Sequence, residues 1–425
     1  MKKVSSPSMS LNPEEGIISQ TIPFSSHPSL PSLYHSYNSS TSSCHHQCIA
    51  TLRSGNSSYI SGLAVVDGDS LYVASSDGQI RLWPLHEKSQ SEVVSTSSST
   101  VAVTNSSVKC LLSTGDNGLV SSHQDGTIRV WRRHAAGDHH LAMRAVLPTA
   151  ADRLRAFLLP ASHVDAPRRH GRRASWVRHV DAVTALAVSP DGAVMYSVSW
   201  DRSLKAWRLP GLRCAESVAE AHDDAVNAVV AAPDWRHVYT ASADATVKAW
   251  RWRPEEGRLS LVSVMARHGA AVNALAIGGG GDGGWVLYSG GCDRSVVVWE
   301  SEASGDGGGA DDVRVMVAGV TLRGHKKAVL CLAAAGDVVC SGSADRTVRV
   351  WRREAAPAEG YSCLAVLDGH GGAVKSLAVV RRGEGCDPCC SCDVEESSCC
   401  GCAALVCSGS LDCDVKLWRV AVSCL

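Results

Sequence analysis

The sequence predicts an all-β protein, a seven-bladed β-propeller, and three observations lead to that prediction. Seven short segments repeat along the chain, and in each an Asp is followed six residues later by a Trp. Each segment has the pattern of strand, tight turn and strand, because small residues flank the Asp and the following side chains alternate. A His that heads an apolar strand stands roughly 20–25 residues before most of these Asp residues, and a fourth strand must join each Trp to the next His.

The repeat is the strongest signal in the chain. Its seven segments are SSDGQIRLW, HQDGTIRVW, SWDRSLKAW, SADATVKAW, GCDRSVVVW, SADRTVRVW and SLDCDVKLW. The Asp column consists of Asp77, Asp125, Asp201, Asp244, Asp293, Asp345 and Asp412. The Trp column consists of Trp83, Trp131, Trp207, Trp250, Trp299, Trp351 and Trp418. Because two residue types recur at one spacing in every segment, we expect each segment to belong to one blade of a closed ring.

Composition excludes several classes of function. The chain has 425 residues, 45% of them hydrophobic and 20% charged, with a formal net charge of −1. That balance is typical of a soluble globular protein and lacks the basic excess that nucleic acids and anionic membranes attract. No apolar run approaches the ~18 residues of a membrane helix, and the start at Met1 lacks the apolar core of a signal peptide. We therefore expect a cytoplasmic or nuclear protein, no direct contact with nucleic acid or membrane, and reduced thiols for most of its 18 cysteines.

The chain divides into a tail and a ring. Residues 1–44 are rich in Ser and Pro and have few apolar side chains to bury, so we expect a disordered tail. Residues 45–425 then hold the seven repeats. Only seven residues follow Trp418, too few for an outer strand and its turn. The segment HQCIATL at 46–52 is therefore predicted to supply that strand, closing the ring and covering its open edge.

With these repeats the chain resembles the WD-repeat family over residues 45–425. Two of that family's glycine–histidine pairs are present, Gly324-His325 and Gly369-His370. The second letter of the family's Trp-Asp signature is lost, because Arg follows five of the Trp residues, Pro84 follows the first and Glu300 the fifth. The chain is more closely similar to the plant JINGUBANG-type WD-repeat proteins, through HQCIATL, SSDGQIRLW, LPTAADRLRAFLLP, RRASWVRHVDAVTAL, YSVSWDRSLKAWR, AHDDAVNAV and YSCLAVLDGH. This resemblance implies a plant regulatory protein connected with pollen germination and tube growth.

The resemblance also implies a buried hydrogen-bonded chain of His, Ser or Thr, Asp and Trp in each blade. Such a chain suits a buried turn, whose backbone donors need an acceptor. The His column consists of His179, His222, His268, His325 and His370, and the first two repeats have Asn or Ser in its place. The hydroxyl column consists of Ser121, Ser197, Thr240, Ser289, Ser341 and Ser408, with Val73 in the first repeat.

A set of Ser, His and Asp also suggests a hydrolase, and we reject that interpretation. The set repeats from blade to blade, whereas a catalytic site is needed once. No Gly-x-Ser-x-Gly nucleophile elbow accompanies it. The Gly-rich stretches at 278–284 and 304–309 lack the Gly-Lys-Ser/Thr end of a phosphate-binding loop. We therefore expect no catalytic residue and no cofactor.

The longest insertion spans residues 145–178 and joins an outer strand to the next inner strand. This connection places it on the same face as the Asp turns, which we name the top face. Its candidate partner-binding residues are Arg168, Arg169, Arg172, Arg173 and Trp176. A solvated loop with a chance basic run explains these residues, and so does a nuclear-import patch or a contact with an acidic partner.

Trp200 is a further candidate for partner binding. It stands directly before Asp201, in a column that consists of Ser76, Gln124, Trp200, Ala243, Cys292, Ala344 and Leu411. The resemblance to the WD-repeat family implies that this column points outward near the top rim. The aromatic side chain is then either an anchor for a partner or core beneath the insertion at 145–178.

Residues 381–403 form a Cys-rich insertion on the opposite, bottom face. Four of the cysteines have the spacing of a zinc knuckle: Cys386, Cys389, Cys399 and Cys402. The tract also holds surplus cysteines and few residues that could build a shell around an ion. We favour a loop of low complexity, and a zinc site is the alternative.

The predicted function is a non-catalytic interaction scaffold, a monomeric ring that acts as a regulatory adaptor and binds a protein or peptide on its top face. The alternative is a substrate receptor of a cullin-type ubiquitin ligase. That class usually shows Trp-Asp-x-Arg at the end of a repeat. Here only Trp250 has an Arg three residues on, Arg253, and Arg251 replaces the Asp. A propeller enzyme, the third class, needs ionisable residues that converge on the central channel.

Overall fold

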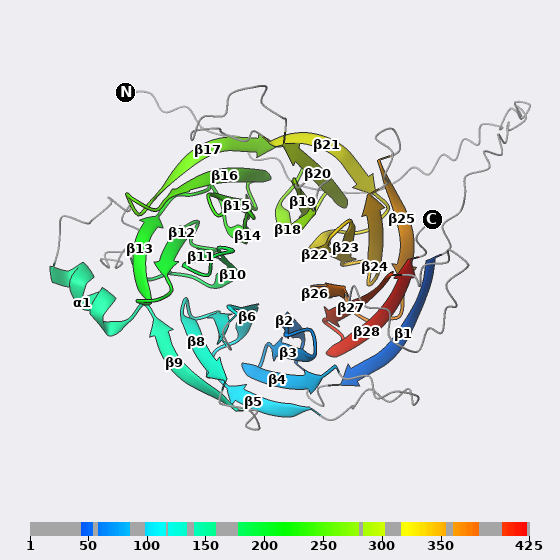
Figure 1. Ribbon diagram of the computed structural model, residues 1–425, viewed down its shortest axis with the longest axis horizontal. Coiled ribbons are helices and arrows are strands. Elements are labelled where there is room, and N and C mark those ends of the chain that lie inside the picture. The colour runs from blue at the N-terminus through cyan, green and yellow to red at the C-terminus, as the bar shows by residue number, and fades with distance from the viewer. Residues whose placement is uncertain are drawn as a thin grey trace, which may run out of the picture. The chain divides into compact units, whose positions relative to one another are not determined.

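Seven antiparallel sheets of four strands each form a closed ring (Figure 1). The computed structural model describes residues 44–53, 58–85, 98–115, 118–133, 140–158, 177–279, 284–301, 316–353, 360–381 and 402–422. We number the sheets as blades 1–7 in chain order. The ring confirms the predicted seven-bladed propeller.

The first three blades place their strands in chain order from the centre outward. Blade 1 contains β2 (Ile60–Val66), β3 (Ser70–Ser75), β4 (Gln79–Pro84) and β5 (Ser99–Val103). Blade 2 contains β6 (Val108–Ser113), β7 (Gly118–His123), β8 (Ile128–Arg133) and β9 (Leu141–Leu147). Blade 3 contains β10 (Val183–Val188), β11 (Val194–Ser199), β12 (Leu204–Arg208) and β13 (Arg213–Val218).

The next three blades repeat the same order. Blade 4 contains β14 (Val226–Ala231), β15 (His237–Ser242), β16 (Thr246–Arg253) and β17 (Arg258–Ala266). Blade 5 contains β18 (Val272–Gly279), β19 (Trp285–Gly291), β20 (Ser295–Ser301) and β21 (Met316–Arg323). Blade 6 contains β22 (Val329–Ala335), β23 (Val338–Ser343), β24 (Val348–Arg353) and β25 (Tyr361–Leu367).

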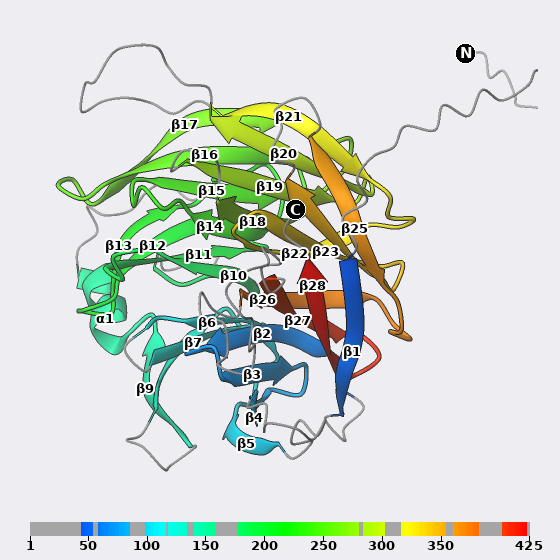
Figure 2. The same cartoon turned by 45° about the vertical axis from the view of Figure 1, so that its right-hand side comes forward.

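The seventh blade is built from both ends of the described chain. It contains β26 (Val374–Arg381), β27 (Cys402–Ser410), β28 (Asp414–Val422) and, outermost, β1 (Cys44–Arg53). β1 runs antiparallel to β28, with Gln47 opposite Arg419 and Leu52 opposite Val415. Figure 2 shows β1 and β28 side by side. This pairing confirms that the N-terminal strand closes the ring, and the strand begins at Cys44, one residue before the predicted boundary.

The core of the ring lies between blades. Each of seven clusters of buried apolar side chains in the described residues joins two neighbouring sheets. Between blades 4 and 5, the ring centroids of Tyr239 and Trp285 lie 5.4 Å apart. Between blades 7 and 1, Leu52 of the closing strand shares a cluster with Trp83. Because both faces of a sheet are covered, inner strands such as β11 and β15 are buried along their whole length.

A bulge near the start of each innermost strand helps to tie neighbouring blades together. The register between the first two strands shifts there in every blade. Three bulge side chains donate a hydrogen bond to a carbonyl of the next blade: Thr184 to Val226 at 2.7 Å, Asn227 to Val272 at 2.9 Å and Asn273 to Val329 at 2.8 Å. The same column holds Lys109 in β6 and Lys375 in β26.

The top-face insertion begins later than predicted and contains a helix. Residues 145–147 still belong to β9, where Leu147 pairs with Ile128, so the outer strand continues past the predicted boundary. α1 (Ala150–Leu158) follows, and the backbone N–H of Asp152 donates to Thr149 Oγ1 at 3.2 Å. The Thr149 hydroxyl donates in turn to the Asp152 carboxylate at 3.0 Å, so Thr149 caps the start of the helix. Within the described ranges, no helix combines the length and apolar character that crossing a membrane requires.

The bottom-face insertion is shorter than predicted. Arg381 pairs with Ala404, and Cys402 pairs with Val422, so both predicted ends belong to strands. The connection between β26 and β27 therefore occupies residues 382–401, which lie outside the described residues.

Candidate functional site

A chain of hydrogen bonds crosses blade 4 from its inner strands to its top turn. The indole N–H of Trp250 on β16 donates to Thr240 Oγ1 on β15 at 2.8 Å. The Thr240 hydroxyl lies 2.7 Å from Nε2 of His222, and Nδ1 of His222 lies 2.8 Å from the Asp244 carboxylate. Asp244 also accepts the backbone N–H of Thr246 at 2.9 Å. The turn, the loop before β14 and two strands are thereby held in one arrangement.

The same four roles are filled in blades 3, 5, 6 and 7. The sets are His179, Ser197, Asp201 and Trp207; His268, Ser289, Asp293 and Trp299; His325, Ser341, Asp345 and Trp351; His370, Ser408, Asp412 and Trp418. The indole bonds measure 2.8–2.9 Å. The distances from His Nδ1 to the carboxylate measure 2.8–3.2 Å. Each of five consecutive blades therefore contains its own copy of the same polar network.

In blade 2 the residue at the usual His position is a Thr. Asn or Ser was expected there from the sequence, but the register of β6 makes Thr104 the counterpart of His179. The Thr104 hydroxyl donates to the carbonyl of Gly78 in blade 1 at 2.8 Å. The same hydroxyl lies 2.8 Å from the carbonyl of Ser106 in blade 2, so Thr104 stands at the junction of the two blades. The corresponding position of blade 1 lies outside the described residues.

A histidine from within the blade replaces the missing one. His123 is the last residue of β7, and its Nε2 lies 2.8 Å from Ser121 Oγ. Ser121 Oγ also accepts the indole N–H of Trp131 at 2.7 Å. Nδ1 of His123 lies 3.3 Å from the carbonyl of Ser106, so the imidazole donates there and accepts from the hydroxyl. A His two residues before the turn Asp, in a repeat without an upstream His, is the signal that could have identified this residue.

Blade 1 lacks the network. Val73 stands at the hydroxyl position and is 2% exposed. Trp83 is fully buried, and its indole nitrogen has no hydrogen-bond partner among the described residues. Asp77 still accepts the backbone N–H of Gln79 at 3.0 Å. The turn of blade 1 is thus formed without the chain of bonds that links it to the core elsewhere.

Burial and hydrogen bonding set the charges of the network. Burial raises the pKa of Asp244, but hydrogen bonds from Thr246 and His222 outweigh it, and the net pKa lies below its ordinary value. Burial lowers the pKa of His222 against the opposing effect of Asp244. At neutral pH the carboxylate is therefore charged and the imidazole is neutral.

The hydroxyl groups of the network are poorly placed for catalysis. Ser121, Ser197, Thr240, Ser289, Ser341 and Ser408 are each 0% exposed. Each accepts a hydrogen bond from a buried indole, as Thr240 does from Trp250. No substrate reaches an oxygen enclosed in this way, so these sets stabilise the blades and are not nucleophilic sites.

Trp200 lies on the top rim of blade 3, in the turn between β11 and β12. Its side chain is 43% exposed, and its backbone N–H donates to the carbonyl of Ala182 at 3.1 Å. Nζ of Lys109, on β6 of blade 2, lies 5.4 Å from the centroid of the indole ring. Val180, in the loop that enters β10, is 72% exposed. Against the described residues Trp200 is an exposed rim residue, and residues 159–176 of the insertion that was expected to cover it lie outside the described residues.

Several candidates lie outside the described residues. They are Arg168, Arg169, Arg172, Arg173, Trp176, Cys386, Cys389 and Cys399, together with the side chain of Cys402. In the part of the chain that the structure describes, no group of three or more His, Cys, Asp or Glu residues could hold a metal ion.

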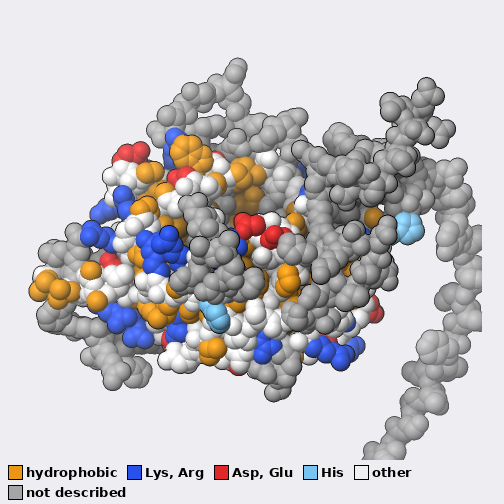
Figure 3. Space-filling view, turned by 60° about the horizontal axis from the view of Figure 1, so that its bottom comes forward, with side chains coloured by type: hydrophobic (Ala, Val, Ile, Leu, Met, Phe, Trp, Pro, Cys, Tyr) orange, Lys and Arg blue, Asp and Glu red, His pale blue; other side chains and the backbone are white. Residues whose placement is uncertain are grey.

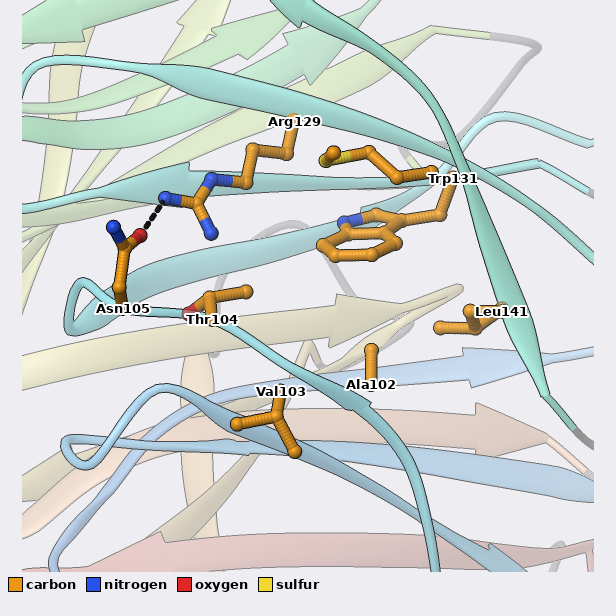
Figure 4. Close-up of a pocket in the computed structure, with 8 residues that line it drawn as sticks. Ala102, Val103, Thr104, Asn105, Arg129, Trp131 and Leu141 are labelled. Carbon is orange, nitrogen blue, oxygen red and sulfur yellow. Dashed lines mark hydrogen bonds between the residues drawn. The ribbon is translucent and has the colours of Figure 1, made fainter.

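A groove of about 440 Å³ lies between blades 1 and 2 (Figure 4). Its lining consists of Ala102, Val103, Thr104, Asn105, Arg129, Trp131, Leu141 and Met143. Arg129 donates to Asn105 Oδ1 at 2.6 Å within the groove. Val103 and Met143 are 69% and 56% exposed. Figure 3, turned so that the lower side of the ring in Figure 1 comes forward, shows apolar and basic side chains interspersed over this view of the surface.

The repeats and the ring match known proteins. The family model described as WD domain, G-beta repeat, matches residues 46–84, 95–132, 172–208, 215–251, 259–300, 318–352 and 361–419. The probable cytosolic iron-sulfur protein assembly protein 1 of Chaetomium globosum is 38% identical over 130 residues, which cover 27% of this chain and 27% of that protein. The chain therefore matches only about a quarter of that relative's length.

A solved structure has the same fold. The crystal structure of the WD40 β-propeller domain of Doa1 aligns with a TM-score of 0.58 and 19% identity, covering 88% of this chain and 96% of that one. Each of the seven stretches matched by the family model ends directly after one Trp of the repeat. Together with the seven sheets of the ring, these matches show that the chain belongs to the WD-repeat family.

Proposed function

We propose that this protein is a regulatory adaptor that binds a protein or peptide on its top face, at Trp200. The WD-repeat propeller is a fold that generally serves interaction and not catalysis. The ring is well suited to that role, because inter-blade packing holds its loops on a rigid frame. The relative named above is an assembly protein, which supports the same class of function.

The exposure of Trp200 carries this proposal. Its counterparts in the neighbouring blades are Gln124 and Ala243, so the repeat does not require an aromatic residue there. Lys109 lies against the ring and restricts it before a partner arrives. An aromatic anchor desolvated in an interface typically contributes about 2 kcal/mol or more, roughly a thirtyfold change in affinity.

Affinity purification with mass spectrometry tests the proposal, with wild type compared against Trp200→Ala. We expect the variant to melt within a few degrees of wild type and to lose its main partner. The matched control is Trp235→Ala, because Trp235 is also exposed, at 61%, but lies in the bottom turn between β14 and β15. The proposal is wrong if Trp200→Ala keeps every partner, or if the two variants lose the same partner.

We further propose a biological role in the control of pollen germination and tube growth, in the cytoplasm or nucleus. Its support is the resemblance of several sequence segments to JINGUBANG-type proteins. A substrate receptor of a cullin-type ligase is the alternative, and its support is the single Arg253. In the structure Arg253 pairs with Glu256 of its own blade at 3.2 Å.

A further inference from the structure

The top face of blades 5–7 carries a cluster of basic side chains. In each of these blades the Asp turn bonds to the loop that enters the innermost strand, through the N–H groups of Cys292 at 2.8 Å, Ala344 at 2.9 Å and Leu411 at 2.9 Å. Side chains of the two loops therefore lie beside one another. Six of the exposed basic residues of these loops and of the adjoining strand ends form what we name the basic arc: Arg294, Arg323, Lys326, Lys327, Arg346 and Lys375.

The positive charge of the basic arc is not neutralised locally. Among the described residues, none of the six side chains forms an ion pair. The carboxylates of Asp293, Asp345 and Asp412 lie in the same turns, but each bonds to a His of the network. Their side chains are only 22%, 7% and 16% exposed, so they are held within the turns. Asp368, in the loop that enters β26, is an exposed carboxylate, and the exposed basic side chains outnumber the exposed acidic ones on this part of the ring.

The described top loops of blades 3 and 4 carry more acidic side chains. Asp181, Glu220, Asp223 and Asp224 are exposed there beside the exposed Arg178, and Glu220 pairs with Arg202 at 3.7 Å. The whole chain has a net charge of −1, and that sum conceals the division. A surface divided in this way orients a charged partner and selects against one of the wrong sign.

An apolar side chain lies within the same region. Leu411, in the turn between β27 and β28, is 46% exposed, and Cys292 in blade 5 is exposed as well. We propose that the basic arc binds an acidic segment of a partner protein, and that an apolar residue of this segment packs on Leu411. This inference rests on the proposed function, because it names the chemistry of the partner on the top face.

The arrangement favours an acidic polypeptide over a nucleic acid. Single-stranded nucleic acids are bound by stacking on exposed aromatic rings. The exposed Trp residues among the described ones are Trp200 and Trp235, and neither lies in blades 5–7.

Fluorescence anisotropy with the full-length chain tests the inference. The probe is a labelled peptide of about twelve residues, mostly Glu with two central Leu, measured at about 50 and 300 mM salt. We expect binding that weakens with salt and that falls about tenfold or more in the triple variant Lys326→Glu, Lys327→Glu, Arg346→Glu. A peptide with Gln in place of Glu should not bind.

The matched control makes the same change of charge on the far side of the ring. Arg132, Arg213 and Arg258 are exposed and lie toward the bottom ends of their strands, so their triple change to Glu should alter affinity by less than about twofold. Thermal melting checks that both triple variants fold. Leu411→Ala should weaken the peptide with Leu by about threefold or more and leave an all-Glu peptide unaffected.

Each contrary result overturns the inference. The inference is wrong if the acidic peptide does not bind, or if the two triple variants lose affinity for it equally. It is also wrong if the triple variant of the basic arc loses a single-stranded oligonucleotide but still binds the peptide. The proposed function fails by a different result, the retention of the main cellular partner by Trp200→Ala. A chain that keeps its Trp200-dependent partner after reversal of the basic arc would refute this inference alone.

Discussion

Blades 1 and 4 bury the same Trp in two different ways. Trp250 of blade 4 is 5% exposed and donates its indole N–H to Thr240, which continues through His222 to Asp244. Trp83 of blade 1 is fully buried as well, but it faces a Val, and its indole nitrogen has no partner among the described residues. The Trp column is thus kept where the network is lost.

This difference shows that packing and the polar network contribute separately to the stability of a blade. Trp83 lies in the cluster between blades 7 and 1, together with Leu71, Leu405, Leu417 and the closing strand's Leu52. Apolar contacts from blades 7 and 1, including the closing strand, hold the indole there, although its N–H remains an unsatisfied buried donor. In blades 3–7 the network adds a second restraint, which connects the core to the turns of the top face.

The largest expected effect comes from removing the acceptor of a complete network. Asp244→Ala should lower the free energy of unfolding by about 2–4 kcal/mol, because the buried donors that bond to Asp244 lose their partner. Asp77→Ala in blade 1 should cost only about 1 kcal/mol, since no His–hydroxyl–Trp chain depends on that carboxylate. Chemical denaturation of the two variants measures the difference.

The control for this pair is Asp223→Ala. Asp223 is exposed beside the network and should change stability by less than about 0.5 kcal/mol. Equal losses in Asp244→Ala and Asp77→Ala would mean that the network adds nothing to the turn itself. Our distinction between the two blades would then be wrong.

In blade 2, the dependence of stability on pH tests the role of His123. Burial, with the nearby charge of Arg129, lowers the pKa of His123 to about 4. The unfolded chain therefore takes up the proton first, and the contribution of neutral His123 is complete above about pH 6.5 and lost as the pH falls toward 4. Between pH 7.5 and 5 this group should account for a loss of about 2 kcal/mol. His123→Ser, which places there the residue found at Ser242 of blade 4, should lose correspondingly less stability over the same range. Identical pH slopes for the two proteins would contradict the assignment.

The columns of the repeat predicted the blades because each column has one physical role. An Asp accepts the turn's N–H groups, and a Trp fills the space between sheets, so both survive in every blade. His123 could not be found in this way, because the same role is filled from another column, where blade 3 has Ser199. A role that moves between columns leaves no periodic signal.

Surface features were harder to predict for a different reason. The spacing of Thr149 and Asp152 is a capping signal for α1, but these residues lie in a stretch that was expected to be a loop. Trp235 adopts a φ of 55°, where the equivalent turn of blade 3 uses Gly192 at 68°. Exposure of such a side chain depends on which elements lie around it, and a single sequence does not contain that information.

The smallest effect is expected from restoring an acceptor in blade 1. Val73→Thr keeps the shape of the side chain and places a hydroxyl where Thr240 stands in blade 4. The new oxygen can accept the indole N–H of Trp83, which removes an unsatisfied buried donor. The gain is limited because, among the described residues of blade 1, no His stands ready to accept the hydroxyl proton in return, so we expect a stabilisation of about 1 kcal/mol or less.

The indole resonance of Trp83 in a ¹⁵N-correlated spectrum should shift downfield in Val73→Thr, and this shift reports the bond independently of stability. Val73→Ala is the control, because it removes packing without adding an acceptor and should destabilise the protein by about 2 kcal/mol. If the Thr variant lost as much stability as the Ala variant, with no shift of the indole resonance, blade 1 could not accommodate a hydroxyl at this position. Packing would then be the reason that its network is absent.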